Sequence, residues 1–424
     1  MAEPWQPLLS GADAAHALDV VRAIAADPTN PGPLDPSSHD DGGGGHAASL
    51  AGGHAGLAVF QAHVARAIGS ESTERLSYHL DASDDALAEV EMSSTLFAGF
   101  TGIGWANAHI ERLIADEAAD LDEIDAIVLQ QLSDPWDGRY ELVSGLTGHG
   151  VYALERLPSA AADRMVALTI ERLREMAIAE GPGLTWFTPR QHLALDIADE
   201  FPSGHVNLGV AHGVPGVVAF LGAACLAGHA PAARPLLEGA VPWLLAQQLD
   251  AASTGLYPPW IAPGVERRPA RLGWCYGDAG VASALLLASR GAGRDDWRTA
   301  ALTVARCAAK RTFETSGVHD AMFCHGAAGV AHLFNRLFQA TGEGWLAHTA
   351  RRWFTQVLQM QRPGSGIAGY QSHVDRQAAP GEWQTDPGLV SGTAGLALAL
   401  LAAATEIEPE WDRALLLSAR TLAR

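Results

Sequence analysis

A Gly-x-x-Gly element recurs seven times along this chain of 424 residues. Each copy opens a run of small and aliphatic residues, as in Gly213-Val-Pro-Gly216 followed by Val217-Val-Ala-Phe-Leu221. The first glycines lie 46, 46, 68, 64, 49 and 66 residues apart, so each interval has room for two helices and their turns. Such internal repetition predicts a repeat architecture. The copies begin at Gly53, Gly99, Gly145, Gly213, Gly277, Gly326 and Gly392.

The segments between the glycines alternate between two kinds of helix. The run after each motif is apolar nearly all round, as in Leu396-Ala-Leu-Ala-Leu-Leu-Ala-Ala403, which is typical of a buried helix. The segments between these runs carry charge on one face, as in 161–173, which is typical of a half-exposed helix. Seven helices of each kind predict an all-α fold, an α/α toroid with an inner and an outer ring.

Seven helix N-termini should then meet at one end of the barrel, which we call the mouth. Glycine suits this crowded place because it permits close backbone approach and positive φ. We assign the toroid to residues 47–424, and an N-terminal helix with a mobile Gly- and Pro-rich loop to residues 1–46. The long intervals hold irregular segments, which often shape binding sites, and we expect a peptide-binding insertion near residues 180–206.

Composition excludes several classes of function. The formal net charge of −20 argues against a nucleic-acid binder or a basic membrane-surface anchor. The first residues carry no signal-peptide pattern, and the apolar runs are too short to span a bilayer, so we expect no membrane insertion. Four cysteines are too few for a disulfide scaffold in a chain of this length. A cytoplasmic protein with reduced thiols is the expectation.

Cysteine stands just before the first glycine in two adjacent repeats, within Gly273-Trp-Cys-Tyr-Gly277 and Phe323-Cys-His-Gly326. Equivalent positions in adjacent repeats should bring Cys275, Cys324 and His325 together at the mouth. Two thiolates and one imidazole form a suitable three-ligand set for Zn²⁺, with a fourth position open for water or substrate. Cys225 and Cys307 lie on helical patterns instead, and we interpret them as core residues.

The motifs Trp274-Cys-Tyr-Gly277 and Cys324-His-Gly326 resemble those of the lanthipeptide cyclases, the LanC family. Asn207-Leu-Gly-Val-Ala-His-Gly213 and Tyr140-Glu-Leu-Val-Ser-Gly145 are similar to further family motifs, so the resemblance covers nearly the whole chain. It implies a zinc-dependent α/α toroid that adds peptide cysteine thiols to dehydroalanine or dehydrobutyrine. The products are lanthionine and methyllanthionine rings, as in lantibiotic biosynthesis.

The resemblance also implies roles for single residues. The family's metal ligands fall on Cys275, Cys324 and His325, the set that the repeats had selected. Its active-site histidine, arginine and tyrosine fall on His212, Arg271 and Tyr276. Where the family has an aspartate, this chain has Glu141, whose carboxylate is one methylene farther from the backbone.

The expected chemistry accounts for these residue types. A thiol that enters the fourth position of zinc loses its proton near neutral pH, and its thiolate attacks the β-carbon of the dehydroamino acid. We expect His212 to move the proton, and Arg271 or Tyr276 to hydrogen-bond the developing oxyanion. Glu141 would orient one of them. We expect His54 and His149 to fill loop space, and His46 to be exposed.

Three alternatives remain open at this point. A carbohydrate-active enzyme on the same scaffold would need paired carboxylates, which the motif positions lack. A LanC-like enzyme that adds glutathione or another small thiol to dehydrated proteins would use the same residues, and a peptide-binding toroid without activity would lack zinc. For the cyclase we expect a dehydrated precursor peptide as partner, and an export transporter for the product. We expect the dehydratase to be a separate protein, because the repeats occupy the chain from about residue 47 onward.

Overall fold

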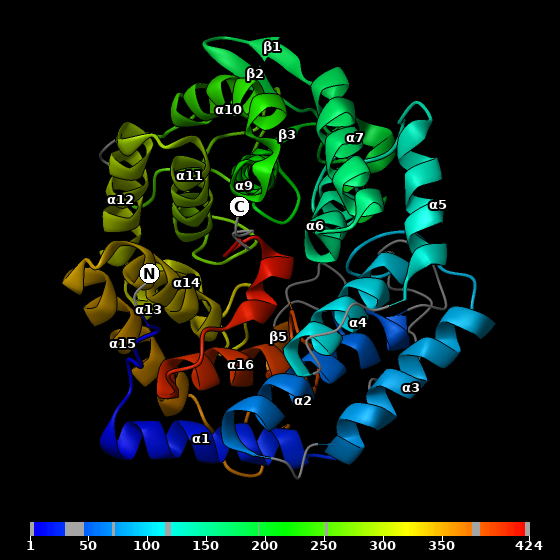
Figure 1. Ribbon diagram of the computed structural model, residues 1–424. Coiled ribbons are helices and arrows are strands. Elements are labelled where there is room, and N and C mark those ends of the chain that lie inside the picture. The colour runs from blue at the N-terminus through cyan, green and yellow to red at the C-terminus, as the bar shows by residue number, and fades with distance from the viewer. Residues whose placement is uncertain are drawn as a thin grey trace.

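The computed structural model describes residues 4–29, 46–69, 73–114, 120–193, 195–250, 253–374 and 382–419. Within these residues two concentric rings of helices form an α/α toroid, as predicted (Figure 1). Every inner helix begins within a residue of the first glycine of a motif, and each packs against the next until the last packs against the first. The inner helices are α2 (His54–Ile68), α4 (Phe100–Ile114), α6 (Leu146–Arg156), α9 (Val214–Ala224), α11 (Asp278–Ala292), α14 (Ala327–Thr341) and α16 (Thr393–Ala404).

The outer ring takes its seventh helix from the N-terminal segment. Helix α1 (Gly11–Ala26) packs against α16, so the two ends of the chain complete one hairpin of the ring (Figure 1). The loop predicted over 28–45 lies almost wholly outside the described residues, and the boundary at residue 46 stays a prediction. The other outer helices are α3 (Thr73–Glu89), α5 (Asp122–Ser133), α7 (Ala160–Met176), α10 (Ala230–Leu245), α12 (Asp295–Ala309) and α15 (Gly344–Gln359).

Close backbone approach explains the second glycine of the motif. In each of the seven repeats, a Cβ atom added there would strike the carbonyl oxygen of the residue six positions earlier, for example Phe323 opposite Gly329. Because backbone atoms cannot yield as a flexible side chain can, only glycine fits without displacing the loop. Positive φ, the other predicted reason, applies to a single glycine of the fourteen, Gly277 with φ 95°.

Backbone hydrogen bonds link the residues two positions before the first glycine in six of the seven repeats, from Cys275 round to Val143. The amide of Cys275 donates to the carbonyl of Cys324 (3.3 Å), the amide of Cys324 to Val390 (2.9 Å), and the amide of Val390 to Ala51 (2.9 Å). The same pattern continues from Ala51 to Phe97 (3.0 Å). Adjacent repeats therefore hold equivalent positions side by side, as the sequence argument for the cysteines requires.

The long intervals contribute short hairpins. The strands β1 (Ile178–Glu180) and β2 (Gly183–Thr185) pair and pack outside α10 (Figure 1), while β3 (Val206–Asn207) pairs with β4 (Trp260–Ile261) from the next repeat. The insertion predicted near 180–206 therefore lies partly on the outside of the ring and ends close to the mouth. The remaining strands, β5 (Ser372–Val374) and β6 (Glu382–Gln384), form a third antiparallel pair. Shorter helical turns are η1 (His46–Ala48), η2 (Arg190–His192), α8 (Leu195–Ala198), η3 (Cys225–His229), α13 (Phe313–Ser316) and η4 (Glu410–Leu415).

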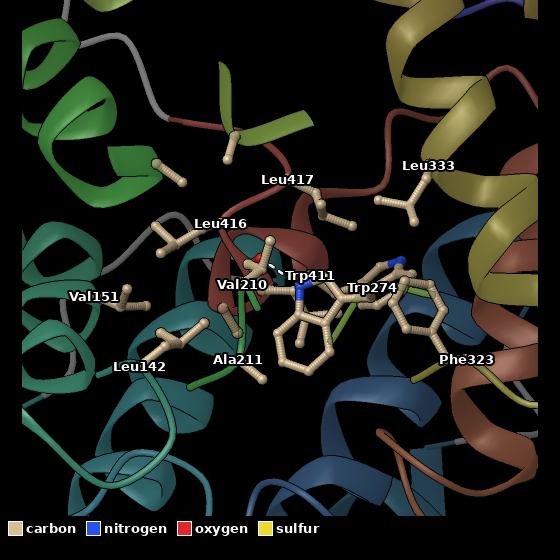
Figure 2. Close-up of a cluster of buried hydrophobic side chains, with 14 of the residues drawn as sticks. Leu142, Val151, Val210, Ala211, Trp274, Phe323, Leu333, Trp411, Leu416 and Leu417 are labelled. Atoms are coloured by element: carbon tan, nitrogen blue, oxygen red, sulfur yellow. Dashed lines mark hydrogen bonds between the residues drawn. The ribbon is translucent and has the colours of Figure 1, made fainter. Parts of the chain in front are cut away.

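The segment η4 enters the ring and fills its interior (Figure 1). Figure 2 shows Trp411 with the side chains of Trp274 and Phe323, the residues directly before the two motif cysteines. The indole of Trp274 donates to the carbonyl of Leu415 at 2.9 Å, and the rings of Trp411 and Phe323 meet edge to face at 5.1 Å. The C-terminal segment therefore supports the loops that carry Cys275 and Cys324.

One stretch, Val214–Leu245, is long and apolar enough to cross a membrane by length and composition. It comprises α9 in the inner ring and α10 in the outer ring, and the chain changes direction at Gly228, whose φ is 106°. All residues of α9 are buried within the barrel, so packing in the toroid accounts for their apolar character.

Candidate metal centre and active site

The loops before the inner helices present two neighbouring positions at the mouth. The position two residues before the first glycine holds Cys275 and Cys324, and the position one residue before it holds His212, Tyr276 and His325. The repeat pattern predicted one common position for Cys275, Cys324 and His325, but His325 lies one residue nearer to its glycine than the two cysteines do to theirs. The distinction matters because Cys275 and Cys324, at the first of these positions, belong to the chain of backbone hydrogen bonds around the mouth.

Cys275, Cys324 and His325 form a compact cluster. One ligand atom from each residue lies within 4.8 Å of the others, and no other group of three or more candidate ligands is found among the described residues. Cys275 is buried, and Cys324 and His325 are half-buried. The loops touch directly, since the amide of Trp274 donates to the carbonyl of Cys324 at 2.8 Å. The structure therefore brings together the three predicted ligands.

The donor set of this cluster fits a zinc ion. Zn–S distances of about 2.3 Å in a tetrahedral site place two sulfurs roughly 3.8 Å apart, so small side-chain movements would close the cluster on a metal. The Nδ1 nitrogen of His325 is buried and has no hydrogen-bond partner among the described residues. A buried ring nitrogen is normally satisfied, and a metal ion would satisfy this one. The cluster can thus hold a metal such as zinc.

The electrostatics of the cluster favour thiolate. The hydrogen bond from the Cys324 thiol holds the pKa of Cys275 well below its usual range, burial opposes this effect, and His325 and Arg271 add to it. The pKa of Cys324 is raised in turn by its neighbour Cys275. Only one of two thiols this close can ionise readily, because a second negative charge beside the first is unfavourable without a neighbouring cation. A divalent cation would allow both to ionise.

Glu141 and His212 form a pair at the mouth. The Nδ1 nitrogen of His212 lies 3.1 Å from Oε2 of Glu141, and the Glu141 carboxylate also accepts the amides of Val143 (2.7 Å) and Ser144 (2.8 Å). The side chain of His212 is 45% exposed, whereas that of Glu141 is 5% exposed. The buried carboxylate is fixed by two backbone amides, so it can hold the imidazole of an accessible histidine in one orientation.

Tyr276 lies beside this pair. Its ring centroid is 6.5 Å from that of His212, and its hydroxyl oxygen accepts a hydrogen bond from Nδ2 of Asn207 at 3.1 Å. Arg271 is half-buried six residues before Gly277, and its charge acts on both cysteines and on Tyr276. The four predicted catalytic residues therefore gather at the mouth with the cluster, but their roles in a reaction stay predictions.

The remaining predicted residues have structural partners. His149 is buried, donates a hydrogen bond from Nδ1 to the Gly145 carbonyl, and forms a second hydrogen bond between Nε2 and the Ser94 hydroxyl. Burial lowers the pKa of His149 to about 4. His54 contacts His79 through their Nδ1 nitrogens at 2.8 Å. The side chain of His46 lies outside the described part of the structure.

The two other cysteines lie in helical segments and do not belong to the cluster. Cys225 is buried after α9, and Cys307 is half-buried in the outer helix α12. Burial raises the pKa of the Cys225 thiol to about 11, and it raises that of Cys307 as well. Both are therefore held as neutral thiols. Cys225 belongs to the hydrophobic core, as predicted, whereas Cys307 is half-buried on an outer helix and lies outside the core, so that prediction is wrong for Cys307.

Sequence reasoning missed Asn207 as a contact of Tyr276, and it missed the aromatic side chains beside it. Trp260 of β4 lies 6.2 Å from Tyr276 between ring centroids and 5.2 Å from Phe201. The signal for Asn207 was available, because it stands six residues before the first glycine, the position that Arg271 fills in the next repeat. The aromatic neighbours come from irregular segments and had no such signal.

A helical toroid with a Cys–Cys–His cluster at its mouth is the class of protein that this fold and site define. The family described as "Lanthionine synthetase C-like protein" matches residues 46–416. The chain belongs to this family.

A solved structure agrees with the fold. A structure described as nisin cyclase superposes with a TM-score of 0.70 and 18% sequence identity over 94% of this chain and 97% of that chain. A sugar epimerase from a ruminal bacterium has a TM-score of 0.46 and 9% identity over 91% of this chain and 98% of its own. No curated protein sequence matches the chain. At 18% identity the nisin cyclase structure bears on the fold alone.

Proposed function

We propose that this protein is a zinc-dependent cyclase that adds cysteine thiols of a dehydrated precursor peptide to dehydroalanine or dehydrobutyrine, forming lanthionine and methyllanthionine rings. One observation carries the proposal: a member of the lanthionine synthetase C-like family has Cys275, Cys324 and His325 clustered at the mouth. Zinc bound there by three protein ligands would lower the pKa of a thiol in its fourth position.

The reaction is a balanced addition. The peptide thiol gives up its proton, its sulfur forms a bond to the β-carbon of the dehydroamino acid, and the electron pair of the double bond moves toward the neighbouring carbonyl oxygen. A proton then adds to the α-carbon. No atom is gained or lost, so no oxidant, reductant or leaving group is required.

The chain's own residues would move the proton and stabilise the charge. With Nδ1 of His212 held by Glu141, the proton exchanged with substrate would pass through Nε2. Arg271 or Tyr276 would donate a hydrogen bond to the developing oxyanion, since both lie at the same end of the barrel. The Glu141 carboxylate would also stabilise the protonated imidazole between the two transfers.

Partners and location follow from this chemistry as further parts of the proposal. The acceptor must be made by a dehydratase acting on serine or threonine, and we propose that a separate protein supplies it. The mature product would leave through an export transporter, and the cyclase itself would act in the cytoplasm on peptides, not on nucleic acid or in a membrane.

The test is ring closure on a dehydrated peptide that carries free cysteines. We expect the wild-type protein to consume thiols, counted by alkylation and mass spectrometry, because cyclisation itself leaves the mass unchanged. His212→Asn should retain its metal but close rings roughly 10²–10⁴-fold more slowly, the range for removal of a general acid or base. His348→Asn, which alters an exposed histidine on the outer helix α15, is the matched control and should behave as wild type.

The same assay separates the rival thiol donor. With glutathione present, an intermolecular enzyme would raise the peptide mass by one glutathione per acceptor, whereas a cyclase leaves the mass unchanged. Thiol consumption that is equal with and without wild-type protein would refute the proposed function. Equal rates for His212→Asn and wild type would refute the role of His212 alone.

A further inference from the structure

We propose that Asn207 is a positioning residue that fixes the hydroxyl of Tyr276 with its oxygen toward Asn207 and its hydrogen toward the mouth. The catalytic use of this orientation rests on the proposed function, whereas the hydrogen bond between Asn207 and Tyr276 does not depend on it. It deepens that function by naming what directs the hydroxyl hydrogen of Tyr276 toward the reacting carbonyl.

The oxygen and the nitrogen of the Asn207 carboxamide have different hydrogen-bond partners. Its Oδ1 accepts the amide of Gly209 at 2.9 Å, which fixes which end is oxygen. Its Nδ2 therefore faces the hydroxyl oxygen of Tyr276, 3.1 Å away, and lies 3.4 Å from Nε2 of His205. An amide nitrogen only donates. The Tyr276 oxygen must accept here, so its own hydrogen points elsewhere.

The surroundings hold Asn207 in this place. Asn207 is buried in β3, opposite Trp260 of β4, and the amide of Leu208 donates to the carbonyl of Pro259 at 2.8 Å. His205 is buried against Phe201, with ring centroids 4.5 Å apart. Burial lowers the pKa of His205 to about 4, and the neutral ring can accept the second hydrogen of Nδ2.

Two other repeats show which part of Asn207 is not needed for the fold. The residue six positions before the first glycine is Asp320 in one repeat and Asp386 in another. Each accepts an amide two residues on, that of Met322 at 3.0 Å and that of Gly388 at 2.7 Å, which is the turn that Asn207 makes with Gly209. An aspartate therefore supplies the oxygen that accepts the hydrogen bond of this turn.

The amide nitrogen is what distinguishes Asn207 from these aspartates. Because the turn uses only the oxygen, the nitrogen is available for another purpose, and its partner is a residue at the mouth of the barrel. Tyr276 also faces His212, which is proposed to move the proton. The hydroxyl hydrogen of Tyr276, directed away from Asn207, can thus be donated to a substrate between the two residues.

The test uses the exchange that keeps the turn and removes the donor, Asn207→Asp. The new carboxylate would accept the hydrogen of Tyr276 and turn it away from the mouth. We expect kcat for ring closure to fall about tenfold, the effect of one hydrogen bond of ordinary strength, with KM and zinc content unchanged. Asp386→Asn, the reverse exchange at the equivalent position, is the control and should keep wild-type kcat.

A double-mutant cycle with Tyr276→Phe decides whether the effect passes through Tyr276. We expect Asn207→Asp to have less than about a twofold further effect on kcat in the Tyr276→Phe protein, because no hydroxyl remains to orient. An undiminished effect there, or wild-type kcat in Asn207→Asp alone, would overturn the inference.

The contact between Asn207 and Tyr276 can also be tested without the proposed activity. If the wild-type protein closes no rings, the proposed function fails, and the same four proteins are compared by thermal unfolding. Additive shifts in melting temperature would show that Asn207 does not hold Tyr276 and would overturn the inference. Non-additive shifts would support the contact.

Discussion

The C-terminal segment inside the ring depends on one buried carboxylate. Asp412 in η4 is fully buried and accepts four hydrogen bonds: from His332 Nε2 (2.7 Å), Arg336 Nε (2.6 Å), Arg336 Nη2 (2.8 Å) and Ser418 Oγ (2.6 Å). Glu408 pairs with the same arginine at 2.7 Å, but its side chain is 61% exposed. The two carboxylates provide a matched pair of perturbations.

Asp412→Asn should destabilise the protein far more than Glu408→Gln. The first change leaves a buried arginine facing an amide, and breaking one partner of a buried ion pair costs about 3–5 kcal/mol. The second removes an exposed ion pair, which contributes about 0–1 kcal/mol. Because Trp274 donates to Leu415 in the same segment, we also expect Asp412→Asn to bind metal less tightly at Cys275.

The assay is denaturant unfolding followed by tryptophan fluorescence, at neutral pH and again in acid. Burial alone would raise the pKa of Asp412, but Arg336 and His332 outweigh it and hold that pKa well below the usual range. A group with a lowered folded-state pKa stabilises the protein above its unfolded pKa of about 3.9 and loses this stabilisation as the pH falls below that value. The difference between wild type and Asp412→Asn should therefore shrink below about pH 4. Equal destabilisation by Asp412→Asn and Glu408→Gln at neutral pH would refute this reasoning.

Two further predictions concern the mouth. Glu141→Gln should slow ring closure roughly tenfold to a hundredfold, since a charge-assisted hydrogen bond of about 1.5–3 kcal/mol no longer orients His212; an initial rate of thiol loss equal to wild type would contradict this. Gly329→Ala should lower the free energy of unfolding by about 1–3 kcal/mol or more, because its Cβ would strike the Phe323 carbonyl. Gly344→Ala, where a Cβ meets nothing within 4 Å, should cost nothing, and equal denaturation midpoints for the two alanine variants would remove the steric explanation of the motif.

The sequence predicted the ring and the metal cluster for one reason: both depend on position within a repeat. Equivalent positions in adjacent repeats lie side by side, so Cys275 and Cys324 could be placed together although 49 residues separate them. His212 and Tyr276 were identified instead by the resemblance of their motifs to those of the LanC family. No detail of side-chain packing was needed for these conclusions.

The features that the sequence did not predict depend on contacts outside the repeat. The hydrogen bond between Asn207 and Tyr276 joins residues 69 positions apart and requires the pairing of β3 with β4, two short strands in irregular segments. The packing of α1 against α16 joins the two ends of the chain. The filling of the ring by Trp411 likewise has no counterpart in other repeats, so no periodic pattern could indicate it.

Metal stoichiometry in three purified proteins tests the central claim most directly. The account predicts about one zinc ion per chain in the wild type, because the three-ligand cluster of Cys275, Cys324 and His325 is a single site. Cys324→Ala should lose most of the zinc, whereas Cys307→Ala, which alters a half-buried thiol in α12, should retain it. Equal zinc content in the two variants, or a wild-type protein that binds no zinc when zinc is supplied, would contradict the assignment of the cluster.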